Sequence, residues 1–408
     1  MKGDLRNLDE KKLEVHYWEL PKDVFVSLNK EFHDRLCRLA QIKANYNFKN
    51  CFHKILNCPK WHAQRLYNQE IRFTIKELTT LSNILHISPY KIEKNIEAIG
   101  NQEDGTIIKN PNFPFKLKDL FYVASHLFFD GSFRYKRGCY FYVYEDDLLE
   151  YHKKRLNNFG EVPMNLIKKE NQLYFSYTIG FIVKCFLEID NFKSTSCYLS
   201  EKFKYFAKKY KILTDEIIKA MIVDEGAVED KIKIELANER LTKELYDIIS
   251  EYYRLNKLAF RERNIYFKNN PEWDHKLKCW KIEFSSESFE NLYNSLSPLP
   301  IGYKERAFKL LHRRKIRGWY KRKPGETKKM VIRSLLSKPK SIFELADELC
   351  IKNGTILSHI YGHPTYSTPL MELDLIKKVK IKELKRGGYT KVDIYGILNI
   401  KHAKEFIK

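Results

Sequence analysis

The stretch VASHLFFDG at residues 123–131 and the stretch IKAMIVDEG at residues 218–226 share one form, an apolar helical run that ends in an acid and a glycine. A carboxylate at a helix end beside a glycine turn is a poor core residue, but it is a good metal ligand because hard cations prefer oxygen. Asp130 and Glu225 therefore predict a metal site with two-fold pseudo-symmetry.

The residues that follow each acid also repeat a pattern. After Gly131, alternation and turn residues predict strands at 132–136 and 139–144, a helix at 146–158, strands at 162–168 and 173–178, and a helix at 179–187. After Gly226, they predict strands at 231–237, 258–267 and 276–284, with helices at 242–255 and 286–296. Units of roughly a hundred residues in the order αββαββα indicate an internal duplication.

This duplication resembles the LAGLIDADG, or dodecapeptide, homing endonucleases in their single-chain form with two motifs. The matching residues are Ala124, Leu127, Asp130 and Gly131 in the first motif, and Ala220, Ile222 and residues 224–226 in the second. The resemblance implies an α+β fold in which two pseudo-symmetric αββαββα repeats, residues 116–210 and 211–298, form a DNA-binding saddle.

The resemblance also implies an activity, the site-specific, metal-dependent hydrolysis of both strands of double-stranded DNA. It makes Asp130 and Glu225 catalytic residues that hold Mg²⁺ or Mn²⁺. The family uses a basic residue on the last strand of a repeat, and Lys281 is the candidate for this role in the second repeat. The corresponding strand of the first repeat, residues 172–178, has no lysine or arginine.

Alternation along the predicted strands places basic and aromatic side chains opposite an apolar face, which fits a DNA duplex. The candidates for DNA contact on these strands are Arg134, Lys136, Arg137, Tyr140, Tyr142, Lys231 and Lys233. An ordinary half-solvated sheet is the alternative interpretation, because such alternation is generic.

The charge of the chain favours a polyanionic partner. The chain has 74 Lys and Arg against 52 Asp and Glu, a net charge of +22. Residues 303–329 alone contain twelve Lys or Arg against two acids. Within this run the candidates for phosphate contact are Arg313, Arg314, Arg317, Lys321 and Arg322. A solvated linker is the alternative interpretation.

Two further domains are expected beside the core. Residues 1–100 show helical spacing without a strand pattern, which predicts an all-α domain. Within it, residues 51–96, and especially residues 59–67, resemble a repressor-like helix-turn-helix, with a bundle that only packs on the core as the alternative. Residues 101–115 are expected to be a linker, and residues 299–327 a basic linker. Residues 328–408 predict a winged helix, with a capping box at Ser341 and Glu344, or a protein-interaction module of the same fold.

Other properties narrow the class of protein. No apolar run is long enough to span a membrane, and the N-terminus is unlike a signal peptide, so we expect a cytoplasmic protein without a membrane partner. Eight cysteines without a Cys-x-x-Cys pair fit reduced thiols. Cys51, His53, Cys58 and His62 are a candidate zinc cluster, although their spacing matches no common pattern of ligands.

Two other functions stay open on the sequence alone. A non-cleaving, DNA-binding transcriptional regulator would keep the same fold, and His126 and Val223, which depart from the motif, favour it. The retention of both acids favours the enzyme. An RNA maturase is the third function, because charge does not distinguish RNA from DNA. We expect a free-standing, monomeric protein whose partner is double-stranded DNA.

Overall fold

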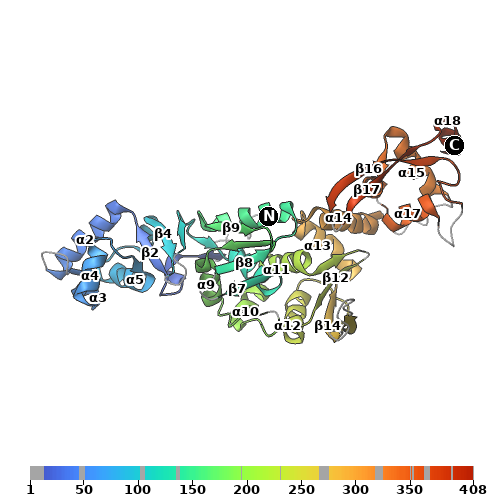
Figure 1. Cartoon of the computed structure of the whole chain (residues 1–408). Helices are drawn as coiled ribbons and strands as arrows, with labels where there is room; N and C mark the ends of the chain where they lie inside the picture. The colour runs from blue at the N-terminus through green and yellow to red at the C-terminus, as the bar shows by residue number, and fades with distance from the viewer. Residues whose placement is uncertain are drawn as a thin grey trace, which may run out of the picture. The chain divides into compact units, whose positions relative to one another are not determined.

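The computed structural model describes residues 13–45, 51–101, 106–134, 138–193, 195–229, 231–265, 275–317, 325–349, 351, 353–362, 368–386 and 389–407. The fold is mixed α+β with several small antiparallel sheets. The chain divides into two compact units, Met1–Gly302 and Tyr303–Lys408, whose elements are labelled in Figure 1. Within the described ranges, no helix combines the length and the apolar character needed to cross a bilayer.

The N-terminal part of the first unit combines helices with a four-stranded sheet. Its elements are β1 (Glu14–Val15), η2 (Tyr17–Glu19), β2 (Phe25–Leu28), α2 (Lys30–Ala44), α3 (Cys51–Leu56), α4 (Lys60–Tyr67), β3 (Phe73–Thr74), α5 (Ile75–Ile84), α6 (Pro89–Glu93), β4 (Ile96–Gly100) and β5 (Ile107–Lys109). The sheet has the order β3-β2-β4-β5. The prediction of an all-α domain is therefore wrong.

Two strands in this region directly adjoin a helix, which explains this difference. Helix α2 begins at Lys30, where Asn29 caps it by accepting a hydrogen bond from the Phe32 amide. Strand β2 precedes it and buries Val26 and Leu28. Likewise α6 ends at Glu93 and β4 follows. Where a short strand adjoins a helix, the apolar spacing of one continues into the other and hides the boundary.

The stretch expected to be a linker, residues 101–115, contains β5 and leads into β6 (Phe115–Lys116), which pairs with β1. The Asn110 side chain donates a hydrogen bond to Glu161 at 2.7 Å, and the hydroxyls of Thr106 and Ser176 bond at 2.8 Å. This stretch is thus hydrogen-bonded to the segment that follows it.

The rest of the first unit contains two four-stranded antiparallel sheets. The first segment comprises α7 (Leu117–Phe128), β7 (Gly131–Arg134), β8 (Gly138–Tyr142), α8 (Asp146–Leu156), η3 (Asn157–Phe159), β9 (Met164–Ile167), β10 (Gln172–Phe175) and α9 (Tyr177–Phe186), and α10 (Glu201–Lys209) follows it. The second segment comprises α11 (Lys211–Asp224), β11 (Gly226–Val228), β12 (Ile232–Leu236), α12 (Glu239–Ser250), β13 (Ala259–Ile265), β14 (His275–Glu283), η5 (Ser286–Ser288) and α13 (Phe289–Leu296). The sheet orders are β7-β8-β10-β9 and β11-β12-β14-β13.

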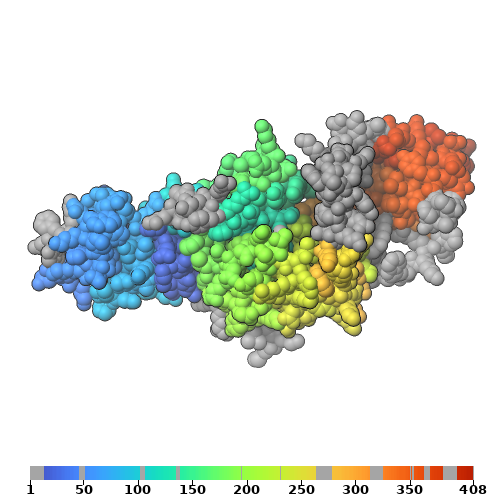
Figure 2. All heavy atoms as spheres, turned by 60° about the horizontal axis from the view of Figure 1, so that its bottom comes forward, coloured from blue at the N-terminus to red at the C-terminus, as the bar shows by residue number. Residues whose placement is uncertain are grey.

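Helices α7 and α11 pack against each other in the middle of the first unit. Every residue of α7 from Leu120 onward is buried. Ala124, Ser125 and Ala220 are buried at this level, and such small side chains permit a short distance between helix axes. Figure 1 shows α11 between the green elements of the first sheet and the yellow elements of the second, and Figure 2 shows the green and yellow surfaces in contact.

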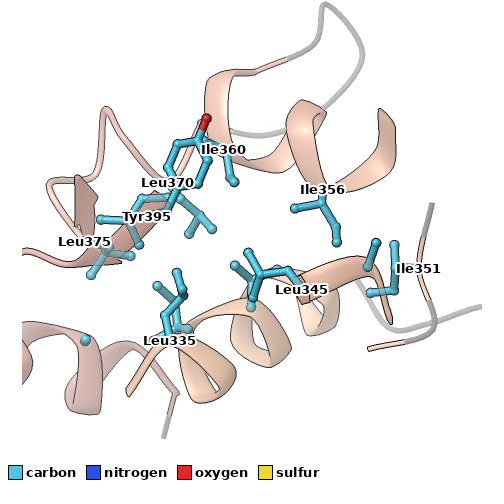
Figure 3. Packing of buried hydrophobic residues seen from close by; sticks show 13 residues of the cluster. Leu335, Leu345, Ile351, Ile356, Ile360, Leu370, Leu375 and Tyr395 are labelled. Atoms are coloured by element: carbon cyan, nitrogen blue, oxygen red, sulfur yellow. The ribbon is translucent and has the colours of Figure 1, made fainter. Parts of the chain in front are cut away.

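The second unit has its own apolar core. Its elements are α14 (Gly302–Arg317), which starts at the unit boundary, α15 (Glu326–Ser337), β15 (Lys340–Ser341), α16 (Ile342–Leu349), α17 (Asn353–Tyr361), β16 (Ile376–Arg386), β17 (Tyr389–Ile397) and α18 (Ile400–Ile407). The sheet order is β15-β17-β16. Figure 3 shows Leu335 and Leu345 pointing toward Ile360, Leu370 and Tyr395 in the buried cluster.

Local structure in this unit matches one prediction and differs from another. The Ser341 amide donates to the Glu344 carboxylate at 2.7 Å and the Glu344 amide donates to the Ser341 hydroxyl at 3.2 Å, which confirms the capping box. Much of the stretch expected to be a basic linker, residues 299–327, is instead helical, because α14 spans it as far as Arg317.

Candidate functional site

Asp130 and Glu225 stand at equivalent places, each directly before the glycine that starts β7 or β11. A Cβ on Gly131 would lie 2.7 Å from the His126 carbonyl oxygen, and one on Gly226 would lie 2.6 Å from the Ile222 Cα. Only glycine therefore allows the strand to turn back directly against the last helical turn. The turn leaves the Asp130 side chain half-buried and the Glu225 side chain exposed.

Both acids act electrostatically on one phenol, that of Tyr144, just after β8. Partial burial raises the pKa of Tyr144, and the negative charge of Asp130 raises it further, with additional effects of Tyr142 and Glu225. Interactions between charges weaken with distance and are screened beyond about 10 Å by salt. Both acids predicted from the sequence therefore contribute to the raised pKa of Tyr144.

In the first sheet, Asp130 begins a row of residues that crosses three strands. Gly131 pairs with Phe141, and the Tyr142 amide donates a hydrogen bond to the Asp130 carbonyl at 3.1 Å. Tyr142 in turn pairs with Gln172 on β10. Directly opposed residues share a face of a sheet, so Asp130, Tyr142 and Gln172 form one row, which we call the first row.

The second sheet has a corresponding row. Gly226 pairs with Ile234, which places Glu225 level with Glu235. Glu235 pairs with Lys281 on β14. We call Glu225, Glu235 and Lys281 the second row. The register thus brings Lys281, the basic residue predicted for the last strand, level with Glu225 of the same segment.

Lys281 is held in place by Glu283. The Lys281 ammonium donates to one carboxylate oxygen at 2.9 Å, whereas Lys231 and Asn256 donate to the other, each at 2.6 Å. Burial alone would raise the pKa of Glu283, but these hydrogen bonds outweigh burial and hold the pKa at about 2. Glu283 is therefore ionised at neutral pH and anchors both lysines.

Arg134 is exposed at the far end of β7, where it donates to the Tyr140 hydroxyl at 3.2 Å and lies over the Tyr140 ring. Tyr140 itself is only 4% exposed, because Arg134 and the rings of Tyr142 and Tyr174 surround it. Tyr140 therefore supports Arg134, and these neighbours cover most of its own ring. Tyr142 is half-buried.

The other residues predicted to contact DNA are of two kinds, those whose side chains the structure describes and those whose side chains it does not. Lys231 is exposed and Lys233 is half-buried, and Lys233 shares the open face of the second sheet with Lys281. Lys136, Arg137, Lys321 and Arg322 lie outside the described residues, as do the side chains of Arg313, Arg314 and Arg317, whose backbone belongs to α14.

Gln172 is a site residue that the sequence did not suggest. It holds in the first row the position that Lys281 holds in the second. Its side chain is 6% exposed, it hydrogen-bonds the Tyr142 side chain, and its amide oxygen is buried without a hydrogen-bond partner. An alignment of the two segments strand by strand, starting from the two acids, is the signal that identifies this residue.

A buried polar contact joins helices α7 and α11 close to the two acids in the sequence. His126 Nδ1 of α7 lies 2.8 Å from Oδ2 of Asp224, the last residue of α11. Burial, followed by the positive charge of Arg155, lowers the pKa of His126 to about 3. The imidazole is therefore neutral and donates its Nδ1–H to the carboxylate. The histidine that departs from the motif thus has its partner on the opposite helix.

Arg155 of α8 extends this polar contact. Its guanidinium lies 3.0 Å from the Asp119 carboxylate of α7 and 3.1 Å from the Glu216 carboxylate of α11. It also lies 4.3 Å from the centre of the Tyr122 ring. Helix α8 therefore contacts both α7 and α11 through one cation, near the first turns of these two helices.

The described ranges contain no group of three or more His, Cys, Asp or Glu residues placed to hold a metal ion by themselves. In the cluster considered for zinc, His53 bonds the Cys58 carbonyl and His62 bonds Glu77 at 2.7 Å. The cysteines of the described ranges form no disulfide.

No protein-family model matches the sequence, and no curated protein matches it significantly. Function must accordingly be inferred from the residues and contacts described above.

Proposed function

We propose that the protein is a site-specific double-strand DNA endonuclease of the LAGLIDADG type. The observation that carries this proposal is the matched pair of rows, each of which starts at the acid after a packed helix and crosses a sheet of the same strand order. Hydrolysis of both strands of a duplex requires an activated water and a stabilised phosphate charge at each of two scissile bonds, and metal ions held by carboxylates can supply both.

The two segments would form the pseudo-symmetric halves of a DNA-binding saddle. Support comes from cations on both sheets, since Lys233 and Lys281 share one face of the second sheet and Arg134 is exposed on the first. The net charge of +22 favours attraction to phosphates. We expect the protein to bind double-stranded DNA as a monomer in the cytoplasm.

The two acids fit Mg²⁺ or Mn²⁺. Mg²⁺ is usually bound by one or two carboxylates together with waters and substrate phosphates, and does not require a cage of protein ligands. Asp130 and Glu225 offer two carboxylates, and neither is fully buried. A bound ion would neutralise phosphate charge and make a coordinated water more acidic.

The reaction would be phosphodiester hydrolysis. The oxygen of a water attacks phosphorus and one P–O ester bond breaks, while the water loses a proton and the leaving oxygen gains one. The products are a phosphate monoester and an alcohol. Lys281 is level with Glu225, which supports a role for its ammonium in stabilising the negative charge that would develop on the phosphate.

Flanking DNA-binding domains would lengthen the recognised site. From α15 to β17 the order helix, strand, helix, helix, strand, strand supports a winged helix, in which α17 would be the recognition helix. In the N-terminal region, α4 leaves Trp61, Gln64 and Arg65 exposed, which supports a second DNA contact there.

The test is to incubate the protein with Mg²⁺ and a plasmid library carrying randomised inserts, and to sequence the cut ends. Asp130→Asn and Glu225→Gln should abolish cleavage but change binding little, because binding depends mainly on contacts elsewhere. Glu150→Gln, at an exposed position of α8, is the matched control and should cut like the wild type. Undiminished cutting by both acid variants would refute the assignment.

A non-cleaving DNA-binding regulator is the second candidate. One observation favours it, namely the neutral Gln172 at the position where the second row has Lys281. Enrichment of one long bound site without any cut ends, in Mg²⁺ and in Mn²⁺, would establish the regulator and exclude the enzyme.

A further inference from the structure

We propose that the first unit contains a separate ligand site, a cavity beside α9 that binds a nucleotide unit through its aromatic base and its phosphate. Two sources offer this chemistry, a free nucleoside monophosphate and an unpaired nucleotide of a DNA strand. The site is distinct from the two rows, and the proposal does not depend on the endonuclease function.

The cavity lies where α9 packs against β7 (Figure 1). Its volume is about 490 Å³, and it is lined by residues of β7, α9 and the segment that follows α9. Sites for small molecules commonly have volumes of about 300–1,000 Å³. Phe133, which lines the cavity, is an odd number of residues from Asp130 and therefore lies on the opposite face of the strand. The cavity is thus on the helix-covered face of the first sheet, away from the first row.

Three aromatic rings form a row along the cavity. The ring of Phe133 is stacked on that of Tyr177 at 5.0 Å between centres, and the ring of Tyr177 is stacked on that of Phe181 at 6.1 Å. A Cβ on Gly180 would lie 2.7 Å from the Phe133 ring, so only glycine lets α9 carry the row so closely. Phe181 is half-buried, so part of its ring is open to the cavity. Every base has an aromatic face and can stack on such a ring.

Two lysines bring positive charge to the cavity. The Lys184 ammonium lies 5.8 Å from the centre of the Phe133 ring, and Lys193 is exposed on the segment after α9. Among the described residues, neither lysine forms an ion pair. Asp190, whose carboxylate accepts a hydrogen bond from the Tyr198 hydroxyl, is the only acid among the described residues of the lining. The lining therefore has an excess of positive charge, which favours an anionic group such as a phosphate.

Asn191 can bind the edge of a base. Its side-chain oxygen accepts a hydrogen bond from the Lys193 amide at 3.0 Å, which fixes its position in this segment. An amide group has two N–H donors besides this oxygen. These donors match the acceptor atoms on the edge of a base, and the Asp190 carboxylate matches an N–H group of a base. The cavity thus combines a stacking surface, polar groups for the base edge and cations for the phosphate.

Cys185 reports whether the cavity is occupied, because it is exposed and belongs to the lining. The experiment measures by mass spectrometry how fast iodoacetamide alkylates Cys185 in the full-length protein while deoxyadenosine monophosphate is titrated. The rate should fall about tenfold when the nucleotide exceeds its dissociation constant about tenfold, since only the free protein reacts. Cys58, half-buried between α3 and α4, is the internal control, and its rate should not change.

A second probe distinguishes the two sources. Protection of Cys185 by the mononucleotide shows that a free nucleotide binds, whereas protection only by a short single-stranded oligonucleotide shows that the base must belong to a DNA strand. If neither probe protects Cys185 with any of the natural bases, the proposal is overturned. Because no Mg²⁺ is added and no bond is cut, these results are independent of the test for the endonuclease function.

Variants test the phosphate contact and the base contact separately. Lys184→Gln should weaken binding of deoxyadenosine monophosphate about tenfold, typical of a lost hydrogen bond to a charged group, and leave binding of deoxyadenosine unchanged. Phe181→Ala should weaken binding of both ligands. Lys209→Gln on α10 is the matched control, because Lys209 also lies over aromatic rings but outside the cavity, and it should bind like the wild type.

The Lys184→Gln variant decides the question even if Phe181→Ala does not fold, because it replaces one half-buried polar side chain by another. Equal weakening of nucleotide and nucleoside by Lys184→Gln would refute the phosphate contact and with it the proposal. If only the oligonucleotide protects Cys185, Lys184→Gln should weaken that protection about tenfold, and an unchanged affinity would overturn the site.

Discussion

His126 and Asp224 connect α7 to α11 through a contact of 2.8 Å between side chains that are 3% and 4% exposed. Asp224 directly precedes Glu225, and His126 lies one helical turn before Asp130. If one partner of a buried hydrogen bond is removed, the other polar group is left unsatisfied and the fold is destabilised. This contact therefore favours one register between α7 and α11. It thereby determines how the two acids are placed relative to each other.

Substitution of His126 by Leu should lower the free energy of unfolding by about 3 kcal/mol, because the buried Asp224 carboxylate would lose its imidazole donor. Asp224→Leu should also destabilise the fold. The double variant should lose less than the sum of the two single losses, since neither polar group is then left behind. Urea unfolding of the wild type and the three variants measures this coupling. Strictly additive losses would contradict a paired interaction.

The same histidine predicts how stability depends on pH. Burial and the charge of Arg155 lower the pKa of His126 from 6.5 to about 3 in the folded protein. Between these values the unfolded chain binds a proton that the folded protein does not, so the free energy of unfolding falls as the pH is lowered from 6.5. Above 6.5 this contribution is fully present.

Urea unfolding at pH 7 and at about pH 5 measures this dependence, because carboxylates titrate mostly below that range. Burial also lowers the pKa of His152 and of His33, so part of the slope will remain in a His126→Leu variant. We expect that variant to lose less stability on acidification than the wild type. An equal loss would show that His126 is already protonated in the folded protein.

The features that the sequence predicts best are those encoded by adjacent residues. The acid before the glycine, the alternation of the strands and the Ser341 capping box are local patterns. Lys281 could be selected because the family resemblance implies a basic residue on the last strand, and the order of the strands follows from such patterns. Its alignment with Glu225 then follows from the pairing of β11, β12 and β14.

The features that escaped prediction depend on partners distant in sequence. His126 departs from an apolar motif, and only the packing of α7 on α11 reveals Asp224 as its partner. Tyr140 alternates with apolar residues like a solvent-facing side chain, but neighbours on β7 and β10 cover it. Gln172 carries no charge, so it becomes notable only through its pairing with Tyr142.

The glycine after each acid should resist substitution. In Gly226→Ala the new Cβ would lie 2.6 Å from the Ile222 Cα, so strand β11 would have to move away from α11. We expect a loss of about 2 kcal/mol in the free energy of unfolding, typical of overpacking. Gly354→Ala on α17 is the control, because its Cβ would meet no atom within 4 Å and alanine favours a helix. Equal effects in urea unfolding would show that the close approach at Gly226 is not constrained.

Removal of residues 303–408, the whole second unit, should weaken DNA binding and reduce its dependence on salt. This unit includes the run 303–329 with its twelve Lys or Arg, and each phosphate that is no longer neutralised reduces the slope of log K against log salt by about 0.9. Fluorescence anisotropy with a labelled duplex at several salt concentrations measures both changes, and circular dichroism confirms that the truncated protein is folded. If a folded truncated protein has the same slope as the full chain, the basic run does not bind DNA phosphates, and recognition then depends on the first unit alone.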